Sequence, residues 1–331
     1  MNIAIFEAKP KEAEYFKKSI HGHKIRFFPK PLDEKNVLKI KNAEAVIIFI
    51  YSNINEKILN KLQSLKLIAT KSTGFDHIDL EACKKRKIIV SNVPFYGENT
   101  VAEHTFALIL SLSRNIHKSY VRTLRNDFTT EGLEGFDIKG KTLGVVGTGH
   151  IGLRVIKIAK GFGMDVLAYD VIHNAFLEEV LGFQYVSLEK LLASSDIITL
   201  HVPYNKYTHH LLNANTIKHI KKGAVLINTS RGGVVETDAL KRALDKKILF
   251  GAGLDVLEGE EFIKEEKELL HNPSKTKKLS KLLRDHIVTT YENVVYTPHI
   301  AFYSKEALER ILDTTVQNIN SFAQNNPIHT V

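Results

Sequence analysis

Short apolar runs alternate with longer polar runs along the first ninety residues of this chain. The apolar runs predict strands that are buried on both faces, because a strand with one solvated face would alternate apolar and polar residues. The polar runs between them have the length and composition of helices. The pattern therefore predicts a parallel sheet with helices on both faces. The predicted strands are residues 2–6, 24–28, 43–50, 65–70 and 87–92, and the predicted helices are residues 9–20, 33–40, 55–63 and 79–86.

A second α/β unit follows a long apolar-rich segment. Residues 98–119 predict one helix, with Thr100 and Glu103 at the spacing of a capping box. Residues 125–140 are polar and contain glycine, which predicts a linker. Six strand-like runs then alternate with helices, as in a doubly wound nucleotide-binding sheet. These runs are residues 142–147, 164–170, 195–203, 223–230, 249–256 and 293–299, with a charged insertion of unusual length at residues 257–293.

The last predicted helix has no strand after it. Apolar residues recur at helical spacing from Ala307 to Leu312. We expect this helix to return to the first sheet, so that one domain is built from residues 1–99 and 300–331 and the other, residues 100–299, is inserted within it. The predicted fold class is α/β, with two doubly wound parallel-sheet domains: a flavodoxin-like domain split by an inserted Rossmann domain.

Composition and charge narrow the classes of function. The net charge of +9 is spread over mixed runs and not gathered in one stripe with aromatic residues, which argues against nucleic-acid binding. The single cysteine, Cys83, cannot form an internal disulfide or a multi-cysteine metal site. No apolar run approaches the length of a membrane span, and the first residues lack the pattern of a signal peptide. We therefore expect a cytoplasmic protein of two domains with no metal and no membrane partner.

The stretch GVVGTGHIG predicts a binding turn. It places Gly147, Gly149 and Gly152 at the G-x-G-x-x-G spacing, after a predicted strand and before a predicted helix. The first glycine permits a tight turn, the second lets the backbone approach a pyrophosphate, and the third lets helix and strand pack closely. The helix start at His150 and Ile151 supplies unpaired N–H groups and the positive end of the helix dipole. A dinucleotide is therefore the predicted ligand.

The strand after this turn ends in Asp170, which indicates the kind of dinucleotide. A carboxylate at this point accepts hydrogen bonds from a ribose diol and repels a 2′-phosphate. No arginine follows within residues 171–176. We therefore expect NAD rather than NADP; the alternative is that Asp170 only begins a polar loop.

Three ionisable residues, Arg231, Glu260 and His299, each follow a predicted strand. Each one alone is most simply a solvated surface residue, since the chain contains many such side chains. Open α/β sheets, however, bind their ligands at the carboxyl ends of the strands. We expect the three side chains to converge on one crevice that faces the dinucleotide.

Six motifs, in this order and over nearly the whole chain, resemble the signatures of the D-2-hydroxyacid dehydrogenases. They are STGFDHID, NTVAEHTFALIL, VGTGHIG, NTSRGGVV, GAGLDVLEGE and TPHIAFYSKEAL. The resemblance implies a split substrate domain with an inserted NAD domain. It also implies a homodimer and the NAD-dependent reduction of a small 2-keto acid to the D-2-hydroxy acid.

The resemblance further implies roles for individual residues. Arg231, Glu260 and His299 match the catalytic arginine, glutamate and histidine of the family. The other matches are Thr73 and Gly74 at the substrate carboxylate, Asp255 at the nicotinamide amide, Thr229 and Ser230 near the nicotinamide ring, and Val202 and Pro203 on the adenine side.

Elementary chemistry suits these roles. Reduction of a 2-keto acid needs a hydride on carbon and a proton on oxygen. The imidazole of His299 suits the proton transfer, because this ring type changes charge near neutral pH. A neighbouring Glu260 carboxylate would favour the protonated ring and fix its tautomer. The planar fork of Arg231 would bind the substrate carboxylate and polarise the carbonyl.

The choice of substrate depends on fewer residues. Tyr51 and Phe302 match aromatic positions of the D-lactate branch and would close a small apolar pocket, although core packing is the alternative for both. Pyruvate is therefore expected ahead of larger 2-keto acids and D-3-phosphoglycerate. Two further functions stay open: an NAD-sensing co-repressor, which the basic charge would suit, and a relative of formate dehydrogenase, against which the acid Glu260 argues.

Overall fold

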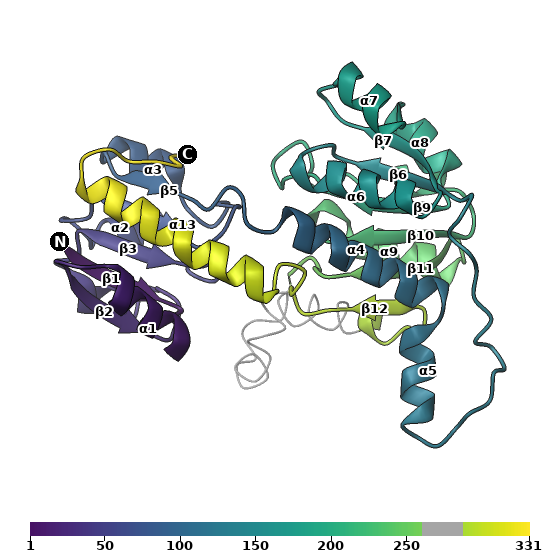
Figure 1. The fold of residues 1–331 in the computed structure, drawn as a ribbon, viewed down its shortest axis with the longest axis horizontal. Coiled ribbons are helices and arrows are strands. Elements are labelled where there is room, and N and C mark those ends of the chain that lie inside the picture. The colour runs from purple at the N-terminus through teal and green to yellow at the C-terminus, as the bar shows by residue number, and fades with distance from the viewer. Residues whose placement is uncertain (260–286) are drawn as a thin grey trace. The chain divides into compact units, whose positions relative to one another are not determined.

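The computed structural model describes residues 1–259 and 287–331, and the chain divides into two compact units (Figure 1). Unit 1 consists of Met1–Tyr96 and Tyr303–Val331, and unit 2 of Gly97–Phe302. Unit 1 is thus assembled from two separate stretches of the chain, and unit 2 is inserted between them.

Unit 1 contains a 5-stranded parallel sheet in the order β2-β1-β3-β4-β5. The order reverses between β1 and β3, which is the flavodoxin-like doubly wound arrangement. Its strands are β1 (Asn2–Phe6), β2 (Lys24–Phe28), β3 (Ala45–Ile48), β4 (Leu67–Thr70) and β5 (Ile89–Ser91). Its helices are α1 (Pro10–Ser19), η1 (Val37–Ile40), α2 (Glu56–Leu59), α3 (Leu80–Lys85) and α13 (Lys305–Ala323).

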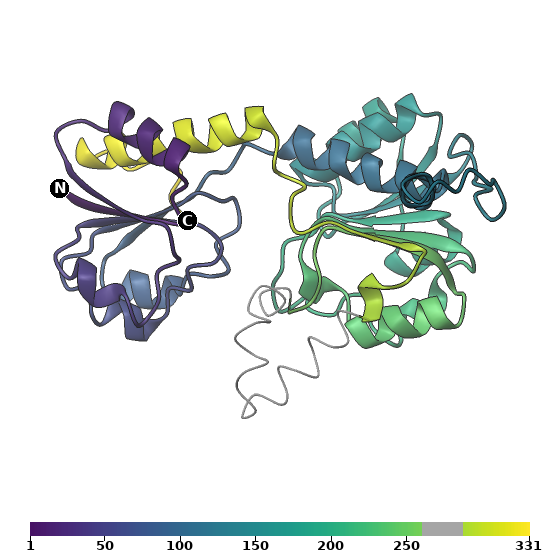
Figure 2. The ribbon, with the colours of Figure 1, turned by 90° about the horizontal axis from the view of Figure 1, so that it is seen from below.

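The strands of unit 1 bury both faces in separate cores, because successive side chains of a strand point to opposite sides. In β1, Ile5 packs with Phe16 of α1 and Ile319 of α13. The next residue, Phe6, packs with Ile58 of α2 on the other face. Figure 2 shows α1 and α13 together on one side of this sheet. The helix α13 therefore fills a core that the residues before unit 2 leave open.

Unit 2 contains a 7-stranded parallel sheet in the order β12-β11-β10-β9-β6-β7-β8. The order reverses between β6 and β9, as in the Rossmann fold. Its strands are β6 (Thr142–Val146), β7 (Asp165–Tyr169), β8 (Gln184–Tyr185), β9 (Ile197–Leu200), β10 (Ala224–Asn228), β11 (Leu249–Leu254) and β12 (Val294–Tyr296). Its described helices are α4 (Glu98–Ser113), α5 (Ile116–Thr123), α6 (His150–Gly161), α7 (Ala175–Leu181), α8 (Leu188–Ser194), η2 (Thr216–His219), η3 (Gly232–Val234) and α9 (Thr237–Asp245).

Unit 2 also has a core on each face of its sheet. Val145 of β6 packs with Ile109 of α4 and Ile156 of α6. The next residue, Val146, lies in the opposite core with Leu240 of α9. The predicted fold class, a flavodoxin-like domain split by an inserted Rossmann domain, is therefore confirmed.

Two local predictions were wrong, and one strand was missed. Residues 98–119 form two helices rather than one, because Asn115 adopts a left-handed conformation (φ 50°) between α4 and α5. The capping box at Thr100 and Glu103 does not exist, because α4 already begins at Glu98 with Gly97 as its N-cap. The short edge strand β8 was not expected. Most of the predicted insertion at residues 257–293 lies outside the described residues.

Features typical of membrane spans and metal sites are absent from the described residues. No helix there has both the length and the apolar character needed to cross a membrane. The same residues contain no group of three or more histidine, cysteine, aspartate or glutamate side chains arranged to hold a metal ion.

Candidate active site

The glycine turn predicted to bind the dinucleotide follows β6. Gly147 has φ 97°, a region that favours glycine, and a Cβ on it would lie 2.7 Å from the carbonyl oxygen of His201. A Cβ on Gly152 would lie 2.0 Å from the carbonyl oxygen of Gly147, so helix α6 could not approach the turn. Gly149, the N-cap of α6, faces open space with nothing within 4 Å of its Cβ position. The turn is therefore closely packed at two glycines and open at the one expected to face a pyrophosphate.

Asp170 is held at the end of β7 by the turn itself. Its Oδ2 accepts hydrogen bonds from the backbone N–H of Thr148 (2.7 Å) and from the hydroxyl of Thr148 (3.1 Å). Its Oδ1 accepts one from the N–H of Ile172 at 3.1 Å. The hydroxyl of Thr148 also lies 2.9 Å from the hydroxyl of Tyr185, whose ring stacks on His173. The carboxylate is thus fixed beside the glycine turn and remains partly exposed.

The segment after β9 forms the other side of the turn, at the point where the strand order reverses. Val202 and Pro203 follow His201 there, and Val202 Cγ1 lies 3.0 Å from the Cβ position of Gly147. The Nε2 of His201 lies 2.9 Å from the hydroxyl of Thr199, and its Nδ1 is buried without a hydrogen-bond partner among the described residues. Burial lowers the pKa of His201 to about 3. This ring is therefore neutral at physiological pH.

Arg231 lies in a turn that directly follows β10. The buried side chain of Asn228 shapes this turn: its Oδ1 accepts from the N–H of Ser230 at 3.0 Å, and its Nδ2 donates to the carbonyl of Arg231 at 3.0 Å. A Cβ on Gly232 would lie 2.0 Å from the carbonyl carbon of Leu257, so the turn packs against the backbone that leads to residue 260. Thr229 is almost buried, and its hydroxyl lies 3.0 Å from that of Thr105 on α4.

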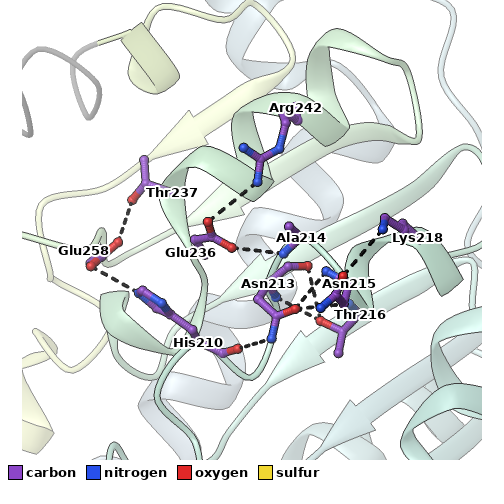
Figure 3. A network of polar contacts seen from close by, with 10 residues as sticks. All are labelled: His210, Asn213, Ala214, Asn215, Thr216, Lys218, Glu236, Thr237, Arg242 and Glu258. Carbon is purple, nitrogen blue, oxygen red and sulfur yellow. Dashed lines mark hydrogen bonds and ion pairs between the residues drawn. The ribbon is translucent and has the colours of Figure 1, made fainter.

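Glu258 anchors the last described residues of this backbone (Figure 3). Its Oε1 lies 3.2 Å from Nε2 of His210, and its Oε2 accepts a hydrogen bond of 3.4 Å from the hydroxyl of Thr237. Glu236 stands beside this pair and accepts from the N–H of Ala214 at 2.9 Å. Glu260, the predicted catalytic glutamate, lies outside the described residues.

His299 follows β12 in a strained backbone conformation. Its φ is 56°, a left-handed value that non-glycine residues seldom adopt, and its N–H donates to the carbonyl of Asp255 at 2.9 Å. The side chain of Asp255 fixes the same loop, because it accepts from the N–H of Ile300 (2.9 Å), the N–H of Ala301 (2.8 Å) and the hydroxyl of Thr297. Asp255 is only 1% exposed. Its carboxylate therefore determines the conformation of the loop that carries His299.

A second histidine, His104 of α4, extends this network. Its Nε2 lies 3.0 Å from the hydroxyl of Thr297 and 3.5 Å from Oδ1 of Asp255. The hydroxyl proton of Thr297 goes to Asp255, so His104 must donate to Thr297 from a protonated Nε2. Burial lowers the pKa of His104, while the Asp255 carboxylate opposes that shift. Phe302 closes the segment, with its ring edge-on to His299 at a centroid distance of 6.4 Å.

In unit 1, Thr73 and Gly74 lie in the loop that follows β4. The carbonyl groups of this loop have partners: that of Ser72 accepts from the N–H of Val93 at 3.1 Å, and that of Gly74 accepts from the hydroxyl of Ser72 at 2.7 Å. The N–H groups of Thr73 and Gly74 find no acceptor within the two stretches of chain that are described. Two successive free N–H groups of this kind suit an anion.

Tyr51 lies in the loop after β3 and is 43% exposed. The carboxylate of Glu7 holds this loop, because it accepts from the N–H of Phe49 (2.9 Å), the N–H of Tyr51 (3.1 Å) and the hydroxyl of Ser52 (2.5 Å). Glu7 itself follows β1 with φ 52°. The exposed Tyr51 ring therefore stands on a rigid loop rather than in the core.

The residues that hold these loops were not predicted from the sequence. Glu7 and Thr297 each directly follow a strand, and Asn228 is the last residue of one. That position was the only signal available for them. His104 gives a weaker signal, as a polar residue within the long apolar-rich stretch that begins α4.

Comparison with known proteins identifies the same architecture elsewhere. A model of the family described as "D-isomer specific 2-hydroxyacid dehydrogenase, NAD binding domain" matches residues 106–301. The chain is 39% identical over 326 residues to a 2-hydroxyacid dehydrogenase homolog of Haemophilus influenzae, covering 96% of this chain and 95% of the relative. It is 35% identical over 328 residues to D-lactate dehydrogenase of Escherichia coli, covering 97% and 96%. A crystal structure of D-lactate dehydrogenase from Aquifex aeolicus, complexed with NAD and lactic acid, superposes with a TM-score of 0.90, at 38% identity, covering 98% of this chain and 96% of the other.

One added methyl group should have different effects at Gly152 and at Gly149. Gly152→Ala should lower both the melting temperature and the affinity for NADH, because its Cβ overlaps the Gly147 carbonyl. Gly149→Ala should leave the melting temperature unchanged, because its Cβ has nothing within 4 Å. It should still weaken NADH binding about 10-fold or more, because the Cβ would meet a pyrophosphate bound at this turn. Thermal unfolding and a fluorescence titration with NADH measure the two effects.

Gly161→Ala is the matched control, since it lies in the same helix with nothing within 4 Å of its Cβ position. It should change neither quantity. Normal NADH affinity in both Gly149→Ala and Gly152→Ala would contradict the assignment of this turn.

Proposed function

The chain belongs to the D-isomer specific 2-hydroxyacid dehydrogenases, and from this membership we propose that it reduces pyruvate to D-lactate with NADH. Membership makes it an oxidoreductase that acts on CH–OH groups with NAD. The finer proposal is supported by full-length similarity to proteins named D-lactate dehydrogenase and by one local observation. That observation is the left-handed His299 held by Asp255 directly after β12.

The cofactor fits the glycine turn of unit 2. We assign the pyrophosphate to the N–H groups of Gly149, His150 and Ile151 at the start of α6, and the adenosine ribose to Asp170. The remaining assigned contacts are Gly147, Gly152, Val202 and Pro203 around the turn, and Thr229, Ser230 and Asp255 toward the nicotinamide. When bound, the cofactor supplies the hydride; the protein orients it and excludes competing reactions.

Asp255 also has a structural role, because it holds the loop that carries His299. Its carboxylate accepts three hydrogen bonds from the loop of residues 297–301, which leaves little of it for a ligand. We propose that the main contribution of Asp255 is to position His299. The nicotinamide amide would then bind at the edge of the Asp255 carboxylate.

Four residues would bind and orient the keto acid. The guanidinium of Arg231 forms a two-point contact with the carboxylate and polarises the keto oxygen. The free N–H groups of Thr73 and Gly74 bind the same carboxylate. His299 donates a proton from its ring to the keto oxygen, and Glu260 stabilises the charged ring before that transfer.

The aromatic residues favour a small substrate. Tyr51 is exposed on a loop that Glu7 makes rigid, and Phe302 contacts the ring of His299. If both rings border the bound substrate, they would leave room for a methyl group and exclude long side chains. Larger 2-keto acids and D-3-phosphoglycerate are the next substrates to test. Arg231 and His299 have an assigned role in an enzyme but would have none in a co-repressor.

A panel of 2-keto acids with NADH and with NADPH tests the proposal. Pyruvate should give the highest kcat/KM, NADH should be preferred, and the product should be D-lactate by chiral analysis. A higher kcat/KM for a branched or phosphorylated keto acid would replace the substrate but keep the enzyme class. Retention on DNA or peptide without consumption of NADH would favour the co-repressor alternative.

Two substitutions test the assigned roles. His299→Ala should lower kcat roughly 10²–10⁴-fold, because no other assigned group donates the proton. Arg231→Lys should raise the KM for pyruvate more than it lowers kcat, because an ammonium cannot reproduce a planar two-point contact. His219→Ala, a partly exposed histidine at the end of η2, is the control and should retain normal rates. Near-normal turnover of His299→Ala would remove it as the proton donor.

We also propose that the protein is a homodimer formed through α5. This helix buries none of its residues, and large apolar side chains at four-residue intervals in the sequence stay exposed in it and in the non-helical segment after it. They are Ile116 (56% exposed), Tyr120 (63%), Leu124 (66%) and Phe128 (75%). Figure 1 shows α5 extending away from the sheet of unit 2. Exposed apolar side chains in this number suit an interface with a second copy.

Leu124→Asp should convert the dimer to a monomer by light scattering, because a charge in an apolar interface is costly. Phe176→Asp, on the exposed side of α7, is the matched control and should leave the mass unchanged. A monomeric wild type, or a dimer that both variants leave intact, would reject this interface.

A further inference from the structure

We infer that Asn92, held by Asn318 and His329, positions the anion-binding turn at Thr73 and Gly74. This inference rests on the proposed function, which assigns the substrate carboxylate to that turn. Asn92, Asn318 and His329 lie outside the sequence motifs and have no role among those assigned above. All of them lie in unit 1.

The first observation is a direct contact with the turn. Asn92 follows β5 and is 6% exposed, and its Nδ2 donates to the carbonyl of Thr73 at 2.8 Å. The hydroxyl of Thr73 donates to the carbonyl of Val93, also at 2.8 Å. The carbonyl of Thr73 is thereby drawn toward β5. Because a peptide unit is planar, fixing this carbonyl also fixes the N–H of Gly74.

The second observation is that Asn92 has little freedom of its own. Its carbonyl accepts from Nδ2 of Asn318, a fully buried residue of α13, at 2.8 Å. Its N–H donates to the carbonyl of His329 at 3.0 Å. The ring Nδ1 of His329 lies 2.8 Å from Oδ1 of Asn318, which closes the network. Each backbone polar group of Asn92 and its side-chain amide nitrogen therefore has a partner.

The third observation is the part played by the segment after α13. Thr330 forms an antiparallel bridge with Ser91, and the hydroxyl of Ser91 donates to the carbonyl of Ile328 at 2.9 Å. This segment thus covers β5 at the edge of the sheet. It brings His329 to Asn92 from a distance of more than two hundred positions along the chain.

Together these contacts make the turn asymmetric. The carbonyl groups of Ser72, Thr73 and Gly74 are all bonded within unit 1, while the N–H groups of Thr73 and Gly74 find no acceptor in its described residues. A turn that binds all its acceptors internally and keeps its donors free is preorganised for a carboxylate. Asn92 is the residue that satisfies the central carbonyl, so it acts as a positioning residue for substrate binding.

Asn92→Leu removes the amide donor at nearly constant volume. It should raise the KM for pyruvate about 10- to 100-fold, because a small displacement of the turn misplaces both donors. kcat at saturating pyruvate should fall less than 5-fold, roughly, and the Kd for NADH should stay unchanged, since the cofactor contacts assigned above lie in unit 2. Hydrogen exchange in the peptide covering residues 70–77 should be faster than in the wild type, without any substrate present.

Asn36→Leu is the matched control. Asn36 lies in the same unit and makes the same kind of bond, from Nδ2 to the carbonyl of Pro31 at 2.7 Å, but has no contact with the turn. It should leave the KM for pyruvate and the exchange of residues 70–77 unchanged. Equal KM values in the Asn92 and Asn36 variants would overturn the inference.

A second variant tests the inference if Asn92→Leu does not fold. His329→Ala removes only the ring contact with Asn318 and should raise the KM for pyruvate about 2- to 10-fold at normal NADH affinity. An unchanged KM there, with Asn92→Leu unfolded, counts against positioning. If the wild type reduces no 2-keto acid, the proposed function fails, and the exchange of residues 70–77 in Asn92→Leu or His329→Ala still decides whether this network orders the turn.

Discussion

The buried carboxylate of Asp255 is the constraint on which the proposed catalytic loop depends. It lies at the end of β11, almost without exposure, and can be accommodated there only if donors surround it. The loop after β12 supplies them from Thr297, Ile300 and Ala301. Satisfying one charge in this way forces His299 into its left-handed conformation, a strain that the surrounding bonds maintain. His104 then connects the same loop to α4, so a helix from the other end of unit 2 contributes to it.

Close backbone approaches are the second constraint. Gly152 against Gly147 and Gly232 against Leu257 leave no space for a side chain. The first pair brings the start of α6 to the end of β6, where unpaired N–H groups are concentrated. The second brings the Arg231 turn against the backbone before residue 260. In both places the absence of a side chain lets two backbone segments near strand ends come into contact.

The same device recurs in unit 1 with side chains in place of glycines. A carboxylate or amide after one strand satisfies the backbone of a loop after another: Glu7 for the loop that carries Tyr51, and Asn92 for the loop that carries Thr73. Parallel strands make this possible, since all their carboxyl ends lie at one edge. Each loop is therefore rigid before any ligand arrives, and less entropy is lost on binding.

The sequence by itself determined the fold class and indicated the dinucleotide turn. These features are local patterns, which can be recognised in the sequence because they involve residues close together along the chain. They are the fully apolar strands, the intervening helices and the spacing of Gly147, Gly149 and Gly152. It also indicated Arg231 and His299, because a polar residue after an apolar strand is visible without coordinates. It failed where a local signal was ambiguous: the Thr100 and Glu103 pair has capping-box spacing, yet tertiary packing begins the helix earlier.

Only the tertiary structure decided which residues hold those loops in place. The partners of Thr73 include Asn92, and those of Asn92 include Asn318 and His329, which the chain brings together only when α13 returns to the first sheet. The protonation of His104 at Nε2 likewise depends on a threonine about two hundred positions away. The sequence shows which polar groups need hydrogen-bond partners. It does not show the partners, because they lie far away along the chain and meet only when the tertiary structure forms.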